Sequence, residues 1–248
     1  IASAAGLTMI AVADVLRVGI VSIGNELRQQ GTDLEPHQIY DANRPLLAAL
    51  LKAPWAATID GGIVRDNTES LAAALTKLAT RTDAIVSTGG AMGSDTDHTA
   101  AAIVAAGGWA KSLRIAQRPG KPIVIGAIAG VPLIGLPGNT TAAMVNCMLY
   151  VLPMLLARAG GTPERALGQP AVANSKFDHT AARTDFVPAR IAAFTQDGRP
   201  MLEQLAKGGS ARLGPFVLAD GLAELPPLSP SIGAGDHIIF HPFHRYLS

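Results

Sequence analysis

The sequence has little of what several classes of protein require. Its one cysteine, Cys147, excludes an internal disulfide and a cysteine-based zinc site, and favours a cytoplasmic protein. Only 16% of the residues are charged and the net charge is +1, so charge gives no case for binding nucleic acid or an anionic membrane. We recognise no signal peptide and expect no membrane span. We therefore expect neither nucleic acid nor a membrane as a partner, and we expect small-molecule ligands.

Hydrophobic residues, glycine and proline are plentiful. Of the 248 residues, 48% are hydrophobic, 26 are glycine and 17 are proline. This composition is typical of a folded, loop-rich protein rather than a disordered one. The length allows one large domain, or a medium domain followed by a small one.

A glycine-rich stretch, 87–97, separates an apolar run at 84–86 from a helix-like segment that begins at His98. Glycines in a strand-to-helix turn allow close approach of the backbone, and free amide groups there can face an anion. Asp95 and Asp97 add carboxylates to the same loop. Such a loop suits a phosphate group accompanied by a cation, although a purely structural turn is an alternative interpretation.

Apolar strand patterns alternate with helical patterns in the first two thirds of the chain. This alternation predicts an α/β fold, a mostly parallel sheet with helices on both faces. From Gly168 onward, short alternating strands and Gly/Pro turns predict a small all-β barrel or sandwich. The predicted strands are 17–22, 57–64, 84–86, 123–125 and 131–135, and the predicted helices are 44–52, 69–79 and 140–158.

Four of the predicted strands end in polar or glycine-rich loops. In parallel sheets, ligands bind beyond the carboxyl ends of the strands, so these loops predict one ligand site. The loops are Gly24-Asn25-Glu26, Arg65-Asp66, Gly89 to Asp97, and Pro137-Gly138-Asn139.

Six motifs in this order resemble those of the molybdopterin molybdenumtransferases, which insert molybdate into adenylylated molybdopterin and release AMP. Residues 219–222 with 235–236 resemble the final domain of that family. The six motifs are 22–27, 39–43, 62–67, 88–97, 119–122 and 135–139.

The resemblance implies a domain organisation and partners. Residues 17–160 would form the molybdopterin-binding α/β domain and 168–248 the β-barrel domain. Residues 1–16 would be a linker or the remnant of a missing N-terminal region. The family also implies a homodimer, with recipient molybdoenzymes as further partners.

The resemblance also implies roles for individual residues. Asp66 and Asp97 would hold Mg²⁺ and take part in catalysis, with capping of the following helices as the alternative. Three cations, Arg114, Arg118 and Lys121, would be catalytic and hold molybdate or the AMP phosphate, unless the arginines are merely solvated. Molybdopterin would be bound by Gly24, Asn25, Glu26, Thr88, Gly89, Gly90, Asp95, Pro137, Gly138, Asn139 and Ser210.

Some residues depart from the family pattern. Asn25 stands where an aspartate is usual, and Arg114 and Arg118 stand where the family has lysines. Arginine is a planar fork rather than a point charge, so these exchanges are not neutral. Two other functions therefore stay open: a non-catalytic carrier of molybdopterin or molybdenum cofactor, and a molybdopterin adenylyltransferase.

Overall fold

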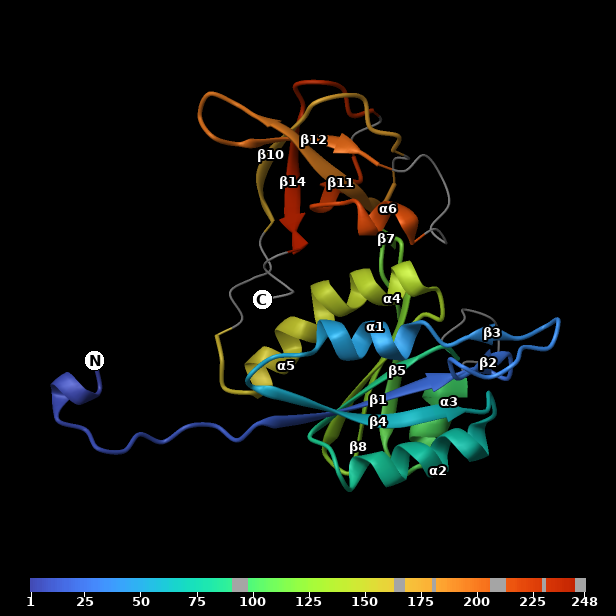
Figure 1. The fold of residues 1–248 in the computed structure, drawn as a ribbon. Helices are drawn as coiled ribbons and strands as arrows, with labels where there is room; N and C mark the ends of the chain where they lie inside the picture. The colour runs from blue at the N-terminus through green and yellow to red at the C-terminus, as the bar shows by residue number, and fades with distance from the viewer. Residues whose placement is uncertain (91–97, 163–167, 180–181, 206–212, 229–230, 244–248) are drawn as a thin grey trace.

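A computed structural model describes residues 1–90, 98–162, 168–179, 182–205, 213–228 and 231–243. The chain forms two units, an α/β layer structure and a β-barrel above it (Figure 1). The combination predicted from the sequence is therefore confirmed.

The α/β unit is built on a six-stranded sheet in the order β4-β1-β5-β9-β8-β6. Neighbouring strands run parallel from β4 to β9, and β8 is antiparallel to both of its neighbours. The strands are β1 (Leu16–Ile23), β4 (Ala56–Val64), β5 (Ala84–Thr88), β6 (Trp109–Arg114), β8 (Pro122–Ile128) and β9 (Val131–Leu136).

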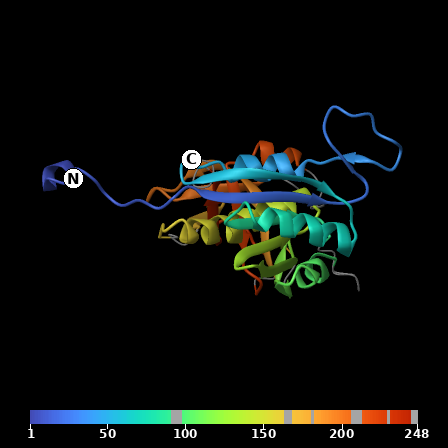
Figure 2. The same cartoon turned by 90° about the horizontal axis from the view of Figure 1, so that it is seen from below.

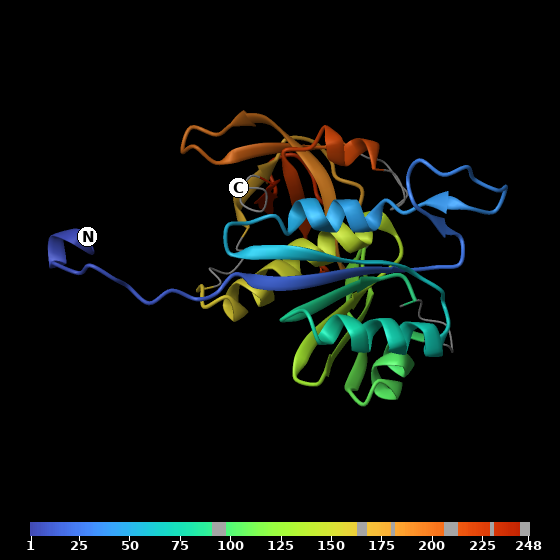
Figure 3. The same ribbon diagram turned by 60° about the horizontal axis from the view of Figure 1, so that its bottom comes forward.

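Helices cover both faces of this sheet (Figure 3). One face packs against α1 (Asn43–Leu50), α4 (Thr140–Asn146) and α5 (Leu152–Arg158), and the other against α2 (Thr68–Ala79) and α3 (His98–Ala105). Alternate residues of β1 enter the two cores, because successive side chains of a strand point to opposite faces. Burial on both faces explains why these strands are continuous apolar runs.

The single helix predicted over 140–158 is divided in the structure. A π-helical segment, η2 (Cys147–Val151), joins α4 to α5. By length and composition this helix could cross a membrane, which corrects our expectation that no segment would; 56% of its most apolar window is buried inside the protein. Cys147 lies in that core, where burial raises the pKa of its thiol to about 12.

The second unit is a closed barrel rather than a sandwich. Its strands pair in the order β12-β10-β14-β13-β11, and a further pairing of β11 with β12 closes the ring. Its core contains the fully buried rings of Phe177 and Phe240. The strands are β10 (Gln169–Ala173), β11 (Thr184–Phe194), β12 (Pro200–Gln204), β13 (Gly221–Leu225) and β14 (His237–Pro242), with a short helix, α6 (Gly214–Val217), before β13.

A short strand of the first unit joins the two units. β7 (Gln117–Arg118) leaves the α/β sheet between β6 and β8 and pairs in parallel with the start of β11. None of the strands predicted from the sequence covers these two residues.

Two segments project from the body on opposite sides (Figure 2). The N-terminal arm, 1–15, is mostly exposed and contains one 3₁₀ turn, η1 (Ser3–Ala5). On the other side, β2 (Leu27–Arg28) and β3 (Ile39–Tyr40) form a parallel two-stranded ribbon. The ribbon follows directly from the end of β1.

Candidate functional site

The four predicted loops leave the sheet along one edge. The last residues of β4, β1, β5 and β9 are in register: Ile23 pairs with Val64, and Thr88 lies between Ser22 and Leu136. We call this the carboxyl edge, comprising residues 24–26, 65–66, 89–90 and 137–139. The predicted convergence of these loops is confirmed.

The loops after β1 and β4 are hydrogen-bonded to each other. The amide of Gly24 donates to the Val64 carbonyl (3.1 Å), and the amide of Asp66 donates to Asn25 Oδ1 (3.2 Å). Gly24 is buried, whereas Asn25 and Glu26 are exposed. Asn25 therefore orients the loop that carries Asp66.

Asp66 carries an unpaired carboxylate oxygen. Its Oδ1 is buried and has no hydrogen-bond partner among the described residues. Helix α2 is capped by Asn67, whose Oδ1 accepts from the amide of Ser70 (2.9 Å). Capping of α2 is therefore the wrong interpretation of Asp66. A buried carboxylate oxygen without a donor is costly, and such groups often mark a place for an ion or ligand.

Backbone crowding requires the glycines after β5. Gly89 has a φ of 88°, and a Cβ atom there would lie 2.1 Å from the Ile23 carbonyl oxygen. A Cβ on Gly138 would lie 3.5 Å from the Cα of Gly89. The glycine loops after β5 and β9 are thus side by side, and their backbone is open to close approach by a ligand.

Asn43 ties these two loops together, although it was not among the predicted site residues. Its Nδ2 donates to Thr88 Oγ1 (2.7 Å) and to the Gly138 carbonyl (2.8 Å), while Thr88 Oγ1 donates to the Pro137 carbonyl (3.0 Å). Asn43 is 8% exposed and its Oδ1 has no partner among the described residues. Its place in the 39–43 motif, directly before a buried helix, was the one signal in the sequence.

The start of α1 is fixed by ion pairs that join the buried Asp41 and Arg44 to the exposed Asp60. Asp41 Oδ1 accepts from the amides of Asn43 and Arg44, both at 3.2 Å, so Asp41 supplies the capping oxygen. Arg44 Nε bonds Asp41 Oδ2 (3.0 Å), and its NH1 bonds Asp60 Oδ1 on β4 (2.6 Å). Burial opposes charge on Asp60, but the bonds from Arg44 and the Gly62 amide outweigh it and lower the pKa of Asp60.

The predicted cations separate into two groups. Arg114 ends β6 and Lys121 precedes β8 at the same edge of the sheet, and both are exposed. By strand spacing, β6 lies on the order of 24 Å from β4 along this edge. Arg118 instead faces the barrel, where its NH2 lies 2.6 Å from Oδ2 of the fully buried Asp185, which also accepts from His179 Nδ1 (3.1 Å).

Of the other predicted site residues, one caps a helix and three lie outside the described part of the chain. Asn139 caps α4, with its Oδ1 accepting from the Ala142 amide (3.2 Å) and the Thr141 hydroxyl (2.7 Å). In the described part of the chain, no three metal-binding side chains form a cluster. Asp95, Asp97 and Ser210 lie outside the described residues.

Profiles of two protein families match the chain. Residues 19–157 match the probable molybdopterin binding domain, and residues 170–243 match the MoeA C-terminal region, domain IV.

Individual relatives give the same result. The chain is 27% identical over 236 residues to a molybdopterin molybdenumtransferase of Haemophilus influenzae, covering 94% of this chain and 57% of that protein. It is 32% identical over 165 residues to molybdopterin molybdenumtransferase 2 of Mycobacterium tuberculosis, covering 64% and 41%. The chain thus spans about half the length of these relatives.

A solved structure has a similar fold over most of this chain. The molybdopterin biosynthesis MoeA protein from Pyrococcus horikosii is 33% identical, with a TM-score of 0.75. The similarity covers 92% of this chain and 54% of that one.

Proposed function

The chain belongs to the molybdopterin molybdenumtransferase family, and on this basis we propose that it acts in molybdenum cofactor biosynthesis, inserting molybdate into adenylylated molybdopterin and releasing AMP. The observation that carries the proposal is the carboxyl edge itself. There, an unpaired buried oxygen of Asp66 shares one edge of the sheet with the adjoining loops of Gly89 and Gly138. Acid and glycine loops together suit a phosphorylated ligand with a cation.

The glycine loops would bind the phosphate groups. Gly89 and Gly90 both have positive φ, and neither they nor Gly138 carry a side chain that would keep a ligand from the backbone. Amide groups in such turns bind anions. Thr88 and Asn43 link the two loops by hydrogen bonds and so keep them side by side.

Asp66 fits Mg²⁺ as one ligand. Magnesium prefers carboxylate oxygens and retains several waters, so one or two protein carboxylates suffice. The unpaired Oδ1 of Asp66 offers such an oxygen, and Asp97 would be the second ligand. When bound, Mg²⁺ neutralises charge on phosphate oxygens. Asn25 would keep Asp66 in place through its bond to the Asp66 amide.

Arg114 and Lys121 would hold molybdate. They lie next to each other, since the Ile115 amide donates to the Lys121 carbonyl (2.8 Å). Cations of this kind bind oxyanions by charge-assisted hydrogen bonds. We further propose a homodimer in the cytoplasm that delivers its product to recipient molybdoenzymes; sedimentation analysis of the chain tests the dimer.

A carrier function is the second candidate, and Arg118 favours it. The guanidinium that would stand in for a family lysine is paired with Asp185. A site with one cation fewer could bind molybdopterin without turnover. The third candidate, molybdopterin adenylyltransferase, gains no support from the barrel domain.

One experiment separates these functions. The chain is mixed with adenylylated molybdopterin, with and without molybdate and Mg²⁺, and AMP release is followed alongside pterin binding. Release that requires both ions supports the transferase. Binding without AMP release supports the carrier, and AMP-forming chemistry that runs only from ATP and molybdopterin supports the adenylyltransferase. No binding of any pterin would overturn the proposal.

A further inference from the structure

The hydrogen bonds of Asn43 fix which way its amide points. The Gly138 carbonyl can only accept, so the atom facing it at 2.8 Å must be the NH₂ group. Thr88 gives its one hydroxyl proton to the Pro137 carbonyl, and therefore accepts from Asn43 as well. Both protons of Asn43 Nδ2 are used inside the protein.

The other half of this amide is unused. Asn43 Oδ1 is buried and has no partner among the described residues, and it is an acceptor that needs a donor. Its position is rigid, because Nδ2 is held at two points and the backbone amide is bonded to Asp41. Structural needs of α1 do not explain the free acceptor, since Asp41 already supplies the capping oxygen.

A second unpaired group lies beside it. Ser22 pairs with Thr88 across β1 and β5, so the two side chains lie on the same face of the sheet. Ser22 Oγ is fully buried and also has no partner among the described residues. A hydroxyl can donate as well as accept. Asn43 and Ser22 together therefore present an acceptor and an adaptable donor next to Thr88.

We propose that Asn43 determines specificity for the pterin ring, with its Oδ1 accepting a hydrogen bond from the amino group of the pyrimidine edge and Ser22 bonding the neighbouring ring atom. This rests on the proposed function. Ionised phosphate oxygens are acceptors, as is Oδ1, so this position suits the amino group of the heterocycle better than it suits a phosphate. Because both atoms are closed to water, the ligand reaches them only when the Gly138 loop moves and its carbonyl releases Asn43 Nδ2, a movement that the conformational freedom of glycine permits.

The test compares two rings that differ at one exocyclic group, with the hydrogen on the neighbouring ring nitrogen changing along with it. Pterin-6-carboxylate carries the amino group, and lumazine-6-carboxylate has an oxo group in its place. Each is used to displace molybdopterin from the chain. We expect the wild-type chain to favour the pterin roughly tenfold, because the lumazine leaves Oδ1 facing another acceptor. In Asn43→Ala the ratio of the two affinities should fall close to one.

Two further variants make the test decisive. Asp41→Ala loosens the start of α1 but keeps Asn43 Oδ1, so both rings should bind less tightly while their ratio stays near tenfold. Ser22→Ala removes only an unpaired hydroxyl and should reduce the ratio severalfold; it answers the question if Asn43→Ala does not fold.

The outcomes separate the two proposals. If molybdopterin binds but the wild-type chain does not discriminate between the rings, or neither ring competes, the role of Asn43 is wrong and the proposed function stands. If the ratio survives in Asn43→Ala, or in Ser22→Ala when that variant must decide, the inference is likewise overturned. If molybdopterin itself does not bind, the proposed function fails.

Discussion

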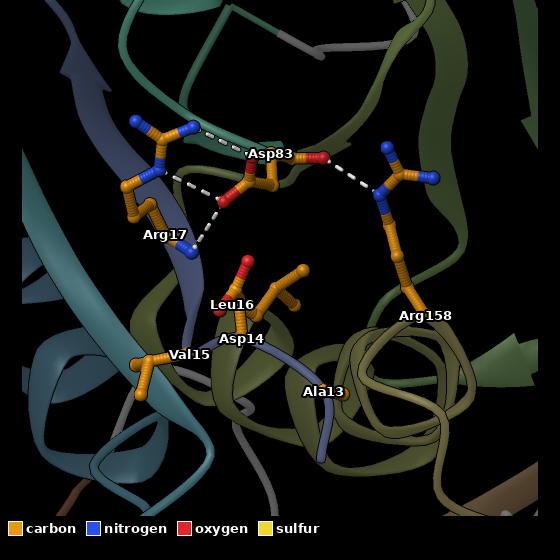
Figure 4. Close-up of a pocket in the computed structure, with 7 residues that line it drawn as sticks. All are labelled: Ala13, Asp14, Val15, Leu16, Arg17, Asp83 and Arg158. Carbon is orange, nitrogen blue, oxygen red and sulfur yellow. Dashed lines mark hydrogen bonds and ion pairs between the residues drawn. The ribbon is translucent and has the colours of Figure 1, made fainter. Parts of the chain in front are cut away.

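The two edges of the α/β sheet hold polar groups in opposite states. At the carboxyl edge, Asp66 Oδ1 and Asn43 Oδ1 are buried and have no partner among the described residues. At the amino edge, where β1 and β5 begin, Asp83 accepts from the Arg17 backbone amide (2.8 Å), Nε (3.0 Å) and NH2 (2.8 Å) (Figure 4). Arg158 Nε donates to the Asp83 carbonyl in turn (2.8 Å).

The amino edge also has a cavity of about 600 Å³, lined by Asp14, Arg17, Asp83, Arg158 and the end of the N-terminal arm. A cavity alone does not make a site, because the carboxylate of Asp83 is already paired with Arg17. At the carboxyl edge, by contrast, the protein bears the cost of unpaired groups that a ligand would remove. In this sheet, buried polar groups without a partner therefore indicate the proposed ligand site better than the volume of a cavity does.

The largest effect that we expect from the difference between the two edges is on enzymatic activity. Asp66→Asn keeps the shape of the side chain but removes the charge that the proposed Mg²⁺ would require, so under the proposed function AMP release should fall at least about a hundredfold. The free energy of unfolding should stay the same or rise, because a neutral amide is less costly to bury than a carboxylate. Steady-state kinetics and urea unfolding measure the two quantities.

Asp83→Asn is the matched control at the other edge. It makes the same chemical change to a carboxylate that is paired, and should leave AMP release unchanged. Equal losses of activity in the two variants would contradict the distinction between the edges.

The next effect concerns the stability of the carboxyl edge. Gly89→Ala combines a left-handed backbone, at φ 88°, with a Cβ placed 2.1 Å from the Ile23 carbonyl oxygen. We expect the free energy of unfolding to fall by about 2–5 kcal/mol, from conformational strain and a clash with rigid backbone.

Gly130→Ala isolates the cost of the left-handed backbone conformation. Gly130 has a φ of 81° in the β8–β9 turn, and a Cβ there meets nothing within 4 Å. Its cost should be about 1–2 kcal/mol, from the backbone conformation alone. If urea unfolding gives the same value for both variants, crowding at Gly89 does not restrict that loop.

The sequence predicted the fold and the edge because both depend on local pattern. Apolar runs and glycine positions specify strands, turns and the order of elements without knowledge of distant contacts. Asp66 was predicted by the same logic, as a polar residue directly after a strand.

Contacts between distant segments could not be predicted in this way. Asn43 gains its importance from Gly138, 95 residues later, and Arg118 meets Asp185 at a separation of 67 residues. Nothing near Arg118 in the sequence indicates that β7 would join the barrel. The family resemblance grouped Arg118 with Arg114 and Lys121. In the structure, Arg118 instead pairs with Asp185 of the barrel.

The pairing of Arg118 leads to a third, smaller effect. Arg118→Ala leaves the fully buried Asp185 with His179 and the more distant Arg183, so we expect the free energy of unfolding to fall by about 1–3 kcal/mol. Much of this loss should disappear when the substitution is made in an Asp185→Asn background, and a double-mutant cycle measures the coupling. No coupling would show that Asp185 does not depend on Arg118, and Arg118 would again be grouped with Arg114 and Lys121.

The smallest effect is the pH dependence of the amino edge. The hydrogen bond from the Arg17 side chain, with that from its amide, lowers the pKa of Asp83 to about 2, against roughly 3.9 for an unfolded chain. A depressed pKa means that Asp83 stabilises the fold above pH 4 and loses this contribution as the pH falls toward 2. Because the pair is partly exposed, Asp83→Asn should lower Tm by only about 1–2 °C at pH 7, and less at high salt. The difference in Tm between the wild type and the variant should shrink as the pH falls through 2 and vanish below it. A difference that persists there would show that the amino edge depends on the shape of Asp83 rather than on its charge, and the contrast with Asp66 would then no longer be one of paired and unpaired carboxylates.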